Sequence, residues 1–162
     1  MEGNGAYNRD AKFQADGSKI ALLYAQEAAQ KVEIDRGVGP IIIADYGSSQ
    51  GKNSLGPMRI AIQELRARIG SDRPIMVYHV DLPVNDFNTL FRTLDADSSS
   101  YTRDAVNVYG CGIGRSFFHT IFPPNYVHIG WSAYAVQWLS CTPVVPVDHC
   151  WFARLGATAR AL

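Results

Sequence analysis

The stretch IIIADYGSSQGKNS, from Ile41 to Ser54, decides the fold of this 162-residue chain. Its β-branched apolar run follows a Gly-Pro pair and ends at Asp45. Such a run predicts a strand that is buried on both faces, and therefore a parallel sheet. The glycines and serines that follow predict a loop at the end of the strand. Ligands of open α/β sheets bind beyond the carboxyl ends of the strands, so this loop is the first candidate for a site.

Helical and strand patterns alternate along the rest of the chain. Apolar residues at helical spacing predict helices within 17–35, 53–70 and 85–94, and Asn85 and Asp86 are candidate N-caps of the last of these. Short apolar runs predict further strands at 73–81, 105–112 and 126–132, of which the run at 105–112 is weak and breaks at its glycines. We expect a loop at 95–105, a short helix or turn at 115–125 and a helix at 132–140.

This alternation predicts an α/β fold with a mostly parallel sheet. Right-handed crossovers are expected to place helices on both faces of the sheet. Asp45 ends the first expected strand and Asp81 ends the second, so both carboxylates belong to the same edge of the sheet. The glycines at 110–114 lie at the end of the third strand.

The composition excludes several classes of protein. Hydrophobic residues make up 47% of the chain and charged residues 19%, with 15 basic residues balancing 15 acidic ones. We therefore expect no nucleic-acid partner, and no membrane partner because no run of about 20 apolar residues occurs. The odd number of cysteines, without C-x-x-C spacing, argues against disulfides and zinc and favours the cytoplasm.

Three kinds of ligand could bind the loop after Asp45: a phosphate group, a dinucleotide or S-adenosylmethionine. A phosphate loop does not fit, because Gly47 and Gly51 are one residue too close for that motif and Asn53 replaces its hydroxyl residue. A dinucleotide site does not fit the glycine pattern either. S-adenosylmethionine is cationic at sulfur and carries a ribose diol, which suits carboxylates at two neighbouring strand ends. The alternative remains that both acids are helix caps or solvated charges.

Five segments in a familiar order then identify a resemblance. They are AYNRDAKFQ, IADYGSSQGKNS, DLPVNDFNTLF, GRSFFHTIFP and SAYAVQWLS. Together they resemble the SABATH family of S-adenosylmethionine-dependent carboxyl methyltransferases and related N-methyltransferases. The resemblance spans about residues 3 to 143. It implies a Rossmann-like class I methyltransferase fold, here truncated after about the fourth strand and without the family's helical cap.

The resemblance also assigns roles to residues of this chain. It implies that S-adenosylmethionine is the cofactor. The spacing of the cysteines and histidines gives no reason to expect a metal. The implied cofactor-binding residues are Tyr7, Asp45, Gly47, Ser48, Asn53, Asp81, Leu82, Ser116 and Phe117. The implied substrate-binding residues are Gln14, Tyr134, Gln137 and Trp138. Of these, Asp81 is expected to hold the ribose hydroxyls, and Gln14 and Trp138 the carboxylate of a small acid; no residue acts as a base.

Several positions depart from the family's usual pattern, and the chain is about half as long as its members. The departures are Asp10, Ser48, Gln50, Lys52, Trp131 and Gln137. We expect an arm at 1–17, a partial cofactor-binding domain at 18–143 and a tail at 144–162. The fourth strand would be a bare edge, which suggests a homodimer. The favoured function is carboxyl methylation; the alternative is a non-catalytic cofactor-binding or interaction module.

Overall fold

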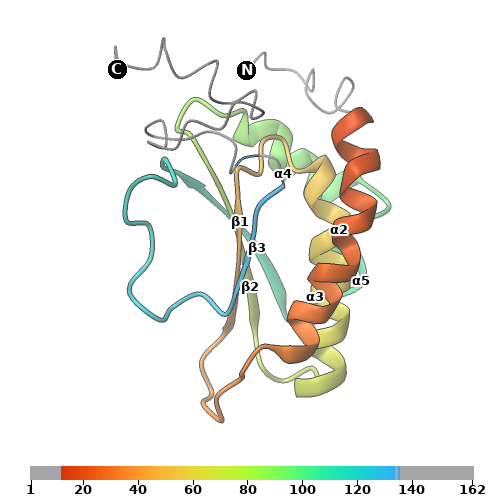
Figure 1. Cartoon of the computed structure of the whole chain (residues 1–162), viewed down its shortest axis with the longest axis vertical. Helices are drawn as coiled ribbons and strands as arrows, with labels where there is room; N and C mark the ends of the chain where they lie inside the picture. Colours follow the sequence, from red (N-terminus) through yellow and green to blue (C-terminus); the bar gives the residue numbers. More distant parts are fainter. Residues whose placement is uncertain (1–11, 134, 136–162) are drawn as a thin grey trace, which may run out of the picture.

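The computed structural model describes residues 12–133 and residue 135. Its centre is a four-stranded sheet in the order β3-β2-β1-β4 (Figure 1). The strands are β1 (Ile41–Tyr46), β2 (Ile75–Asp81), β3 (Val108–Gly114) and β4 (Ile129–Trp131). All three pairings are parallel. The expected parallel sheet, with the fourth strand at its edge, is confirmed.

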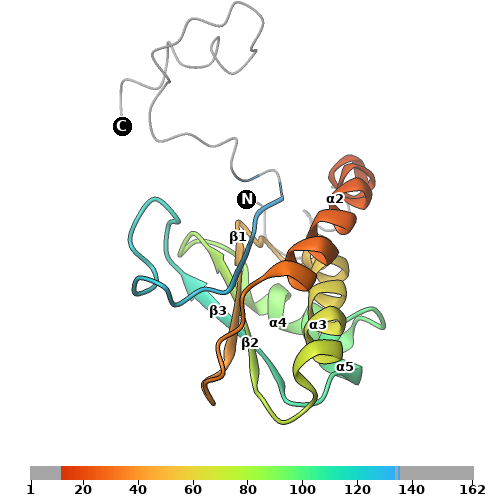
Figure 2. The same ribbon diagram turned by 60° about the horizontal axis from the view of Figure 1, so that its bottom comes forward.

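The helices lie on one face of this sheet, which we call the helix face (Figures 1 and 2). They are α2 (Lys12–Lys31), α3 (Leu55–Ile69), α4 (Phe87–Ala96) and α5 (Tyr101–Asp104), and a 3-10 turn, η1 (Lys52–Ser54), precedes α3. On the other face, which we call the loop face, residues 115–128 connect β3 to β4 without a helix. The expectation of helices on both faces is therefore wrong for the described residues.

Topology explains this asymmetry. The chain moves outward in one direction from β1 to β2 to β3, so right-handed crossovers put α3 and α4 on the same face. The step from β3 back to β4 runs in the opposite direction and crosses the other face. The segment at 115–125 is a series of turns, one of the two forms expected for it.

The core lies between the sheet and the helix face. Apolar side chains that alternate along β1 and β2 meet the buried stripes of α3 and α4, which are the stripes that the helical spacing predicted. The largest buried members of this core are Ile41, Ile43, Ile75, Leu55, Met58, Leu65, Leu90 and Tyr101. The helix α2 packs on α3, where the Gln26 amide donates to the Glu64 carboxylate at 2.6 Å.

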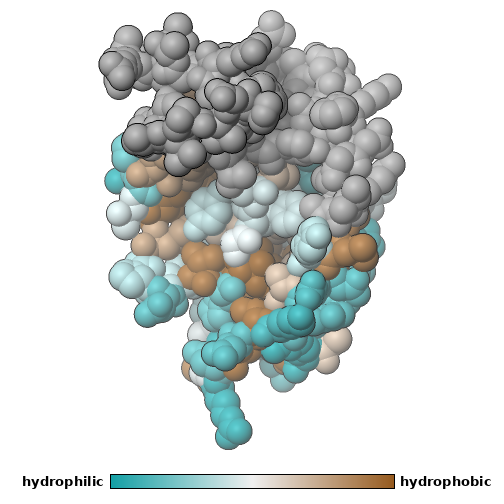
Figure 3. All heavy atoms as spheres, in the orientation of Figure 1, coloured by the Kyte–Doolittle hydropathy of each residue, from teal (hydrophilic) through white to brown (hydrophobic). Residues whose placement is uncertain are grey.

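The loop face is aromatic instead. Phe122 makes edge-to-face contacts with Tyr46 of β1 and Tyr78 of β2, and it stacks with Tyr126. A hydrogen bond between the hydroxyls of Tyr78 and Tyr126, together with burial, raises the pKa of Tyr78 to about 12. Hydrophobic residues gather around the strands in the surface view, whereas the helical side is largely hydrophilic (Figure 3).

Two sequence expectations need correction near β3. The strand does not break at its glycines but continues through Gly114. A Cβ atom on Gly110 would lie 2.8 Å from the Tyr101 hydroxyl oxygen, and one on Gly112 would lie 3.1 Å from Phe87. The glycines therefore allow α4 and α5 to approach the sheet closely. The expected loop at 95–105 contains α5, whose Tyr101 is only 2% exposed.

Helix ends follow the sequence signals. Asp86 is the N-cap of α4, and its carboxylate accepts a hydrogen bond from the Thr89 amide at 3.0 Å. Gly70 ends α3 with a φ of 69°. The helix α2 begins at Lys12 and ends at Lys31, earlier at both ends than its apolar pattern indicated. None of the described helices has the length and apolar character needed to cross a membrane.

His128 connects the start of β4 to β1 and makes the stability of this edge depend on pH. Its Nδ1 accepts a hydrogen bond from the Ile42 amide at 3.0 Å, and its own amide donates to the Ile42 carbonyl at 3.0 Å. Burial, followed by the charge of Arg73, lowers the pKa of His128, and Asp35 opposes this shift. The neutral imidazole is therefore the folded form.

We expect the free energy of unfolding to decrease as the pH falls from about 7 to about 5, because the unfolded chain binds a proton at His128 before the folded chain does. The free energy of unfolding stops decreasing once the pH is below the pKa of His128 in the folded chain. In His128→Asn, the amide oxygen can still accept from Ile42 but cannot titrate, so the decrease should be smaller. Urea unfolding of both proteins across this range measures the difference; identical pH dependence would contradict the role of His128.

Candidate cofactor site at the carboxyl ends of β1 and β2

The loop after β1 has a tightly curled backbone. Gly47, Ser49 and Gly51 have positive φ angles of 82°, 51° and 84°. The amides of Gly47 and Ser48 both donate to the carbonyl of Val80, at 2.8 and 3.2 Å. These two amides are therefore used within the fold. The loop is held against the end of β2 by its own backbone.

Asp45 lies at the base of this loop and is almost fully buried. Its side chain is 2% exposed, and its Oδ2 lies 2.9 Å from Nδ1 of His79, which is fully buried. The other ring nitrogen of His79, Nε2, lies 2.9 Å from the hydroxyl of Tyr101. The described residues provide no further hydrogen bond to Asp45, so Oδ1 retains its capacity to accept.

Asp81 lies at the neighbouring strand end. The β1–β2 register pairs Asp45 with His79, and Asp81 follows two residues later on the same face. Its Oδ2 accepts from the Ser49 amide and its Oδ1 from the Leu82 amide, both at 2.7 Å. The Asp45 carboxylate thus contacts the His79 ring, and the Asp81 carboxylate contacts backbone amides at its own strand end.

Other residues singled out from the sequence lie at the same edge. Leu82 follows Asp81 and is 49% exposed, so it offers an apolar surface at the strand end. Asn53 lies half-buried in η1, and its amide has no hydrogen-bond partner among the described residues. Ser116 follows β3 and its hydroxyl accepts from the Phe118 amide at 3.3 Å.

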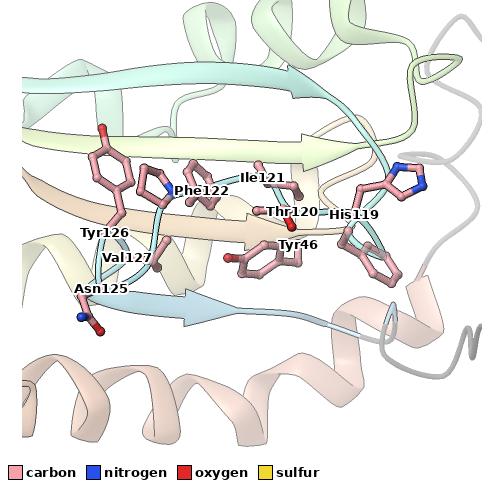
Figure 4. Close-up of a pocket in the computed structure, with 10 residues that line it drawn as sticks. Tyr46, His119, Thr120, Ile121, Phe122, Asn125, Tyr126 and Val127 are labelled. Carbon is pink, nitrogen blue, oxygen red and sulfur yellow. The ribbon is translucent and has the colours of Figure 1, made fainter.

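Phe117 lines a groove on the loop face (Figure 4). The groove has a volume of about 480 Å³ and runs between β1 and the 115–128 loop. Tyr46 is one of its lining residues. Successive side chains of a strand point to opposite faces, so Tyr46 lies on the opposite face of β1 from Asp45. The contact between Phe117 and adenine that the family resemblance implies therefore remains a prediction.

Comparison with known proteins assigns the chain to a family. A family model described as SAM dependent carboxyl methyltransferase matches residues 1–150. The chain belongs to the S-adenosylmethionine-dependent carboxyl methyltransferases. This confirms the resemblance found in the sequence motifs, and S-adenosylmethionine is the cofactor of the family.

Individual members of the carboxyl methyltransferase family support this assignment. The chain is 34% identical over 148 residues to Methyltransferase FUS9 of Gibberella moniliformis, covering 88% of this chain and 39% of that protein. It is 35% identical over 111 residues to a probable 7-methylxanthine methyltransferase of Theobroma cacao, covering 66% of this chain and 30% of that protein. The chain thus spans about two fifths of the length of the first relative.

A solved carboxyl methyltransferase structure shares the fold. It is a loganic acid methyltransferase with SAH, and it superposes with a TM-score of 0.73 at 26% identity. The match covers 88% of this chain and 42% of the other chain. The expected Rossmann-like methyltransferase fold is therefore confirmed.

The residues at the strand ends fit the cofactor of a carboxyl methyltransferase. Several buried side-chain atoms have no partner among the described residues, and those near these strand ends include Ser48 Oγ, Asn85 Oδ1 and Trp131 Nε1. Ser48 and Asn85 belong to the two segments that follow Asp45 and Asp81, and the register places Trp131 beside Asp45. Buried polar atoms are rarely left unpaired in proteins, so these groups are suited to a polar ligand.

Part of the predicted site of this methyltransferase lies outside the described residues. Tyr7, Tyr134, Gln137 and Trp138 belong to this part, and so does the side chain of Gln14, whose backbone lies in the first turn of α2. Their roles remain expectations from the family. Among the departures, Lys52 points away from the loop and forms an ion pair with Asp97, which lowers the pKa of Asp97 to about 2. No cluster of metal-binding side chains occurs in residues that the structure describes.

Sequence reasoning missed two residues that lie next to Asp45 in the structure. The sequence analysis did not single out His79, although its position two residues before Asp81 places it on the same strand face. Tyr101 stands in a polar segment that carries no strand or helix signal of its own. Only the closeness of β3 to α5 brings its hydroxyl to His79.

Proposed function

We propose that this chain forms the cofactor-binding part of a carboxyl methyltransferase that methylates the carboxylate of a small-molecule acid. The family match over residues 1–150 is the observation that carries this proposal. The buried carboxylates of Asp45 and Asp81 at neighbouring strand ends support it. S-adenosylmethionine supplies, when bound, an electrophilic methyl group on a cationic sulfur.

Asp45 and Asp81 would each hold a different end of the cofactor. Each carboxylate oxygen can accept about two hydrogen bonds, and the contacts within the fold use one on Asp45 and one on each oxygen of Asp81. Asp45 is thus suited to the ammonium group of the amino-acid end. Asp81 can accept both ribose hydroxyls through its remaining lone pairs, while Leu82 covers the adenine.

The acceptor side would work by positioning. A carboxylate is already ionised near neutral pH, since its usual pKa is about 4, so no general base is needed. In the family pattern the Gln14 amide and the Trp138 indole N–H donate to the acceptor. Neutral donors hold the anion without a countercharge that would weaken it as a nucleophile. Orientation of this kind can supply about 7–11 kcal/mol of the rate acceleration.

A methyl-transfer assay with labelled S-adenosylmethionine and a panel of aromatic and aliphatic acids tests the proposal. We expect a methyl ester of at least one acid. Trp138→Phe should leave cofactor affinity within about twofold while lowering turnover about tenfold or more, because it removes one hydrogen bond to the acceptor. Equal turnover by both proteins would contradict the role of Trp138.

A cofactor-binding module without turnover is the second candidate. The two buried carboxylates expected to hold the cofactor, Asp45 and Asp81, both lie among the described residues and support it. Binding of S-adenosylhomocysteine without methyl transfer to any acid would support this candidate over the first.

Homodimer formation and a cytoplasmic location are further parts of the proposal. Among the described residues β4 pairs with β1 alone and is a sheet edge, which a second chain could extend. Cys111 is a free, half-buried thiol, as suits a reducing compartment. No nucleic-acid partner is proposed, because the chain has no net charge. Light scattering of the purified chain measures the oligomeric state.

A further inference from the structure

A chain of three hydrogen-bonding side chains runs through the interior to the cofactor site. Tyr101 of α5, His79 of β2 and Asp45 of β1 are joined by contacts of 2.9 Å each. Their exposed fractions are 2%, 0% and 2%. Burial of three polar groups is costly unless each is hydrogen-bonded. Each proton must therefore lie on an atom from which it can be donated to a neighbour.

Counting donors and acceptors fixes where the protons lie. The Tyr101 hydroxyl has one partner among the described residues, Nε2 of His79, so its proton is satisfied only if the hydroxyl donates to that nitrogen. Burial, followed by the charge of Asp45, raises the pKa of Tyr101, which keeps this proton in place. Nε2 is then unprotonated, and Nδ1 carries the imidazole proton and donates it to Asp45.

The fold makes room for this arrangement at one glycine. A Cβ atom at Gly110 would lie 2.8 Å from the Tyr101 hydroxyl and 3.1 Å from Leu94. A larger residue there would displace the hydroxyl from His79. The absence of a side chain in the middle of β3 thus allows Tyr101 to reach a histidine two elements away.

We propose that His79 and Tyr101 are positioning residues for Asp45, with His79 neutral and protonated on Nδ1. The Tyr101 hydroxyl fixes this tautomer, and the imidazole N–H fixes the Asp45 carboxylate. This inference rests on the proposed function, because it gives Asp45 the cationic end of the cofactor as its ligand.

The neutral state of His79 matters for binding. A protonated imidazolium would neutralise Asp45 and compete with the ammonium group of the ligand. A neutral imidazole orients one carboxylate oxygen by a hydrogen bond and leaves the negative charge uncompensated. The other oxygen then faces the site with its full acceptor strength, since a carboxylate is a stronger acceptor when charged.

Nitrogen-15 NMR of the histidine rings tests the tautomer in the unliganded chain. Long-range proton–nitrogen spectra distinguish Nδ1-protonated, Nε2-protonated and doubly protonated rings. The His79 signal is assigned by its loss in His79→Leu. We expect the Nδ1-protonated form at about neutral pH, with an Nε2 resonance that moves in Tyr101→Phe because the hydrogen bond is lost. An Nε2-protonated or doubly protonated ring would overturn the inference.

Calorimetry with S-adenosylhomocysteine tests the positioning role. His79→Leu should weaken binding about tenfold or more, because Asp45 loses a hydrogen bond to a charged group. His79→Asn places an amide N–H near the position of Nδ1 and should restore much of that affinity. Tyr101→Phe should weaken binding about two- to tenfold.

Unfolding experiments on the same variants separate positioning from stability. His79→Leu leaves the buried Asp45 carboxylate and the Tyr101 hydroxyl without their partner, so urea unfolding must first show that both variants are folded under the conditions of the binding measurement. Wild-type affinity in folded His79→Leu, or equal losses in both variants, would refute the role. If the wild-type chain has the expected tautomer but does not bind S-adenosylhomocysteine, the proposed function fails, and the positioning role fails with it. If it binds the ligand but has the wrong tautomer, only the inference fails.

Discussion

Asp81→Ala is expected to lower the affinity for S-adenosylhomocysteine by about 100-fold or more, because two hydrogen bonds from the ribose to a charged group are lost. The carboxylate is 7% exposed at the end of β2 and keeps one lone pair on each oxygen for a ligand. No neighbouring acidic side chain among the described residues can replace it, since Asp45 is hydrogen-bonded to His79. Calorimetry measures the loss directly.

Two controls separate lost ligand contacts from a damaged loop. Asp81→Ala also removes the acceptor of the Ser49 amide, so its unfolding must be measured without ligand. Asp81→Asn keeps the shape and one acceptor oxygen and should bind with intermediate affinity. Asp104→Ala removes a carboxylate that is 71% exposed and paired with Arg59, and it should bind normally. Wild-type affinity in Asp81→Ala would contradict the ribose assignment.

Gly51→Ala should destabilise the chain by about 2 to 5 kcal/mol, from left-handed backbone strain plus overpacking. Gly51 has a φ of 84°, and a Cβ atom there would lie 2.5 Å from Cδ1 of Leu90. Leu90 is fully buried, so it cannot move aside without disturbing α4. Urea unfolding measures the change in the free energy of unfolding.

Gly39→Ala is the matched control for this prediction. No atom lies within 4 Å of the Cβ position at Gly39, and its backbone is not in the left-handed region. Its free energy of unfolding should change by less than about 0.5 kcal/mol, as for most surface substitutions. Equal stability of the two variants would show that the loop after β1 does not pack on α4 as described.

The sequence predicted the parts of the fold that depend on local pattern. The β-branched run ending at Asp45 is typical of a strand buried in a parallel sheet, and the stripe through Met58, Ile62 and Leu65 is typical of the buried face of a helix. The Asp86 cap and the Gly70 stop are likewise local signals. Such features need no knowledge of distant contacts.

Features that depend on distant contacts could not be predicted in this way. In the sequence, the glycines of β3 resemble a strand break. The structure shows that they lie where Tyr101 and α4 pack closely on the sheet. Tyr101 is buried, but the polar residues that precede it in the sequence do not indicate this. The proton arrangement of His79 depends on partners 34 and 22 residues away in sequence.

The positions of the candidate residues, rather than their roles, can be compared with the sequence predictions. Asp45 and Asp81 follow from strand ends and motif, and the register of β1 and β2 places them at one edge. Gly47 and Ser48 were expected to line the cofactor loop, and the structure shows that their amides donate to the carbonyl of Val80. These hydrogen bonds depend on the pairing of β1 with β2, so the sequence around Gly47 alone does not indicate them.

A crystal structure of this chain with S-adenosylhomocysteine is the most direct test of a cofactor site at these strand ends. We expect the ribose hydroxyls within hydrogen-bonding distance of Asp81, and the ammonium group on the free oxygen of Asp45. A ligand bound elsewhere, with both carboxylates contacting only the protein, would contradict the site.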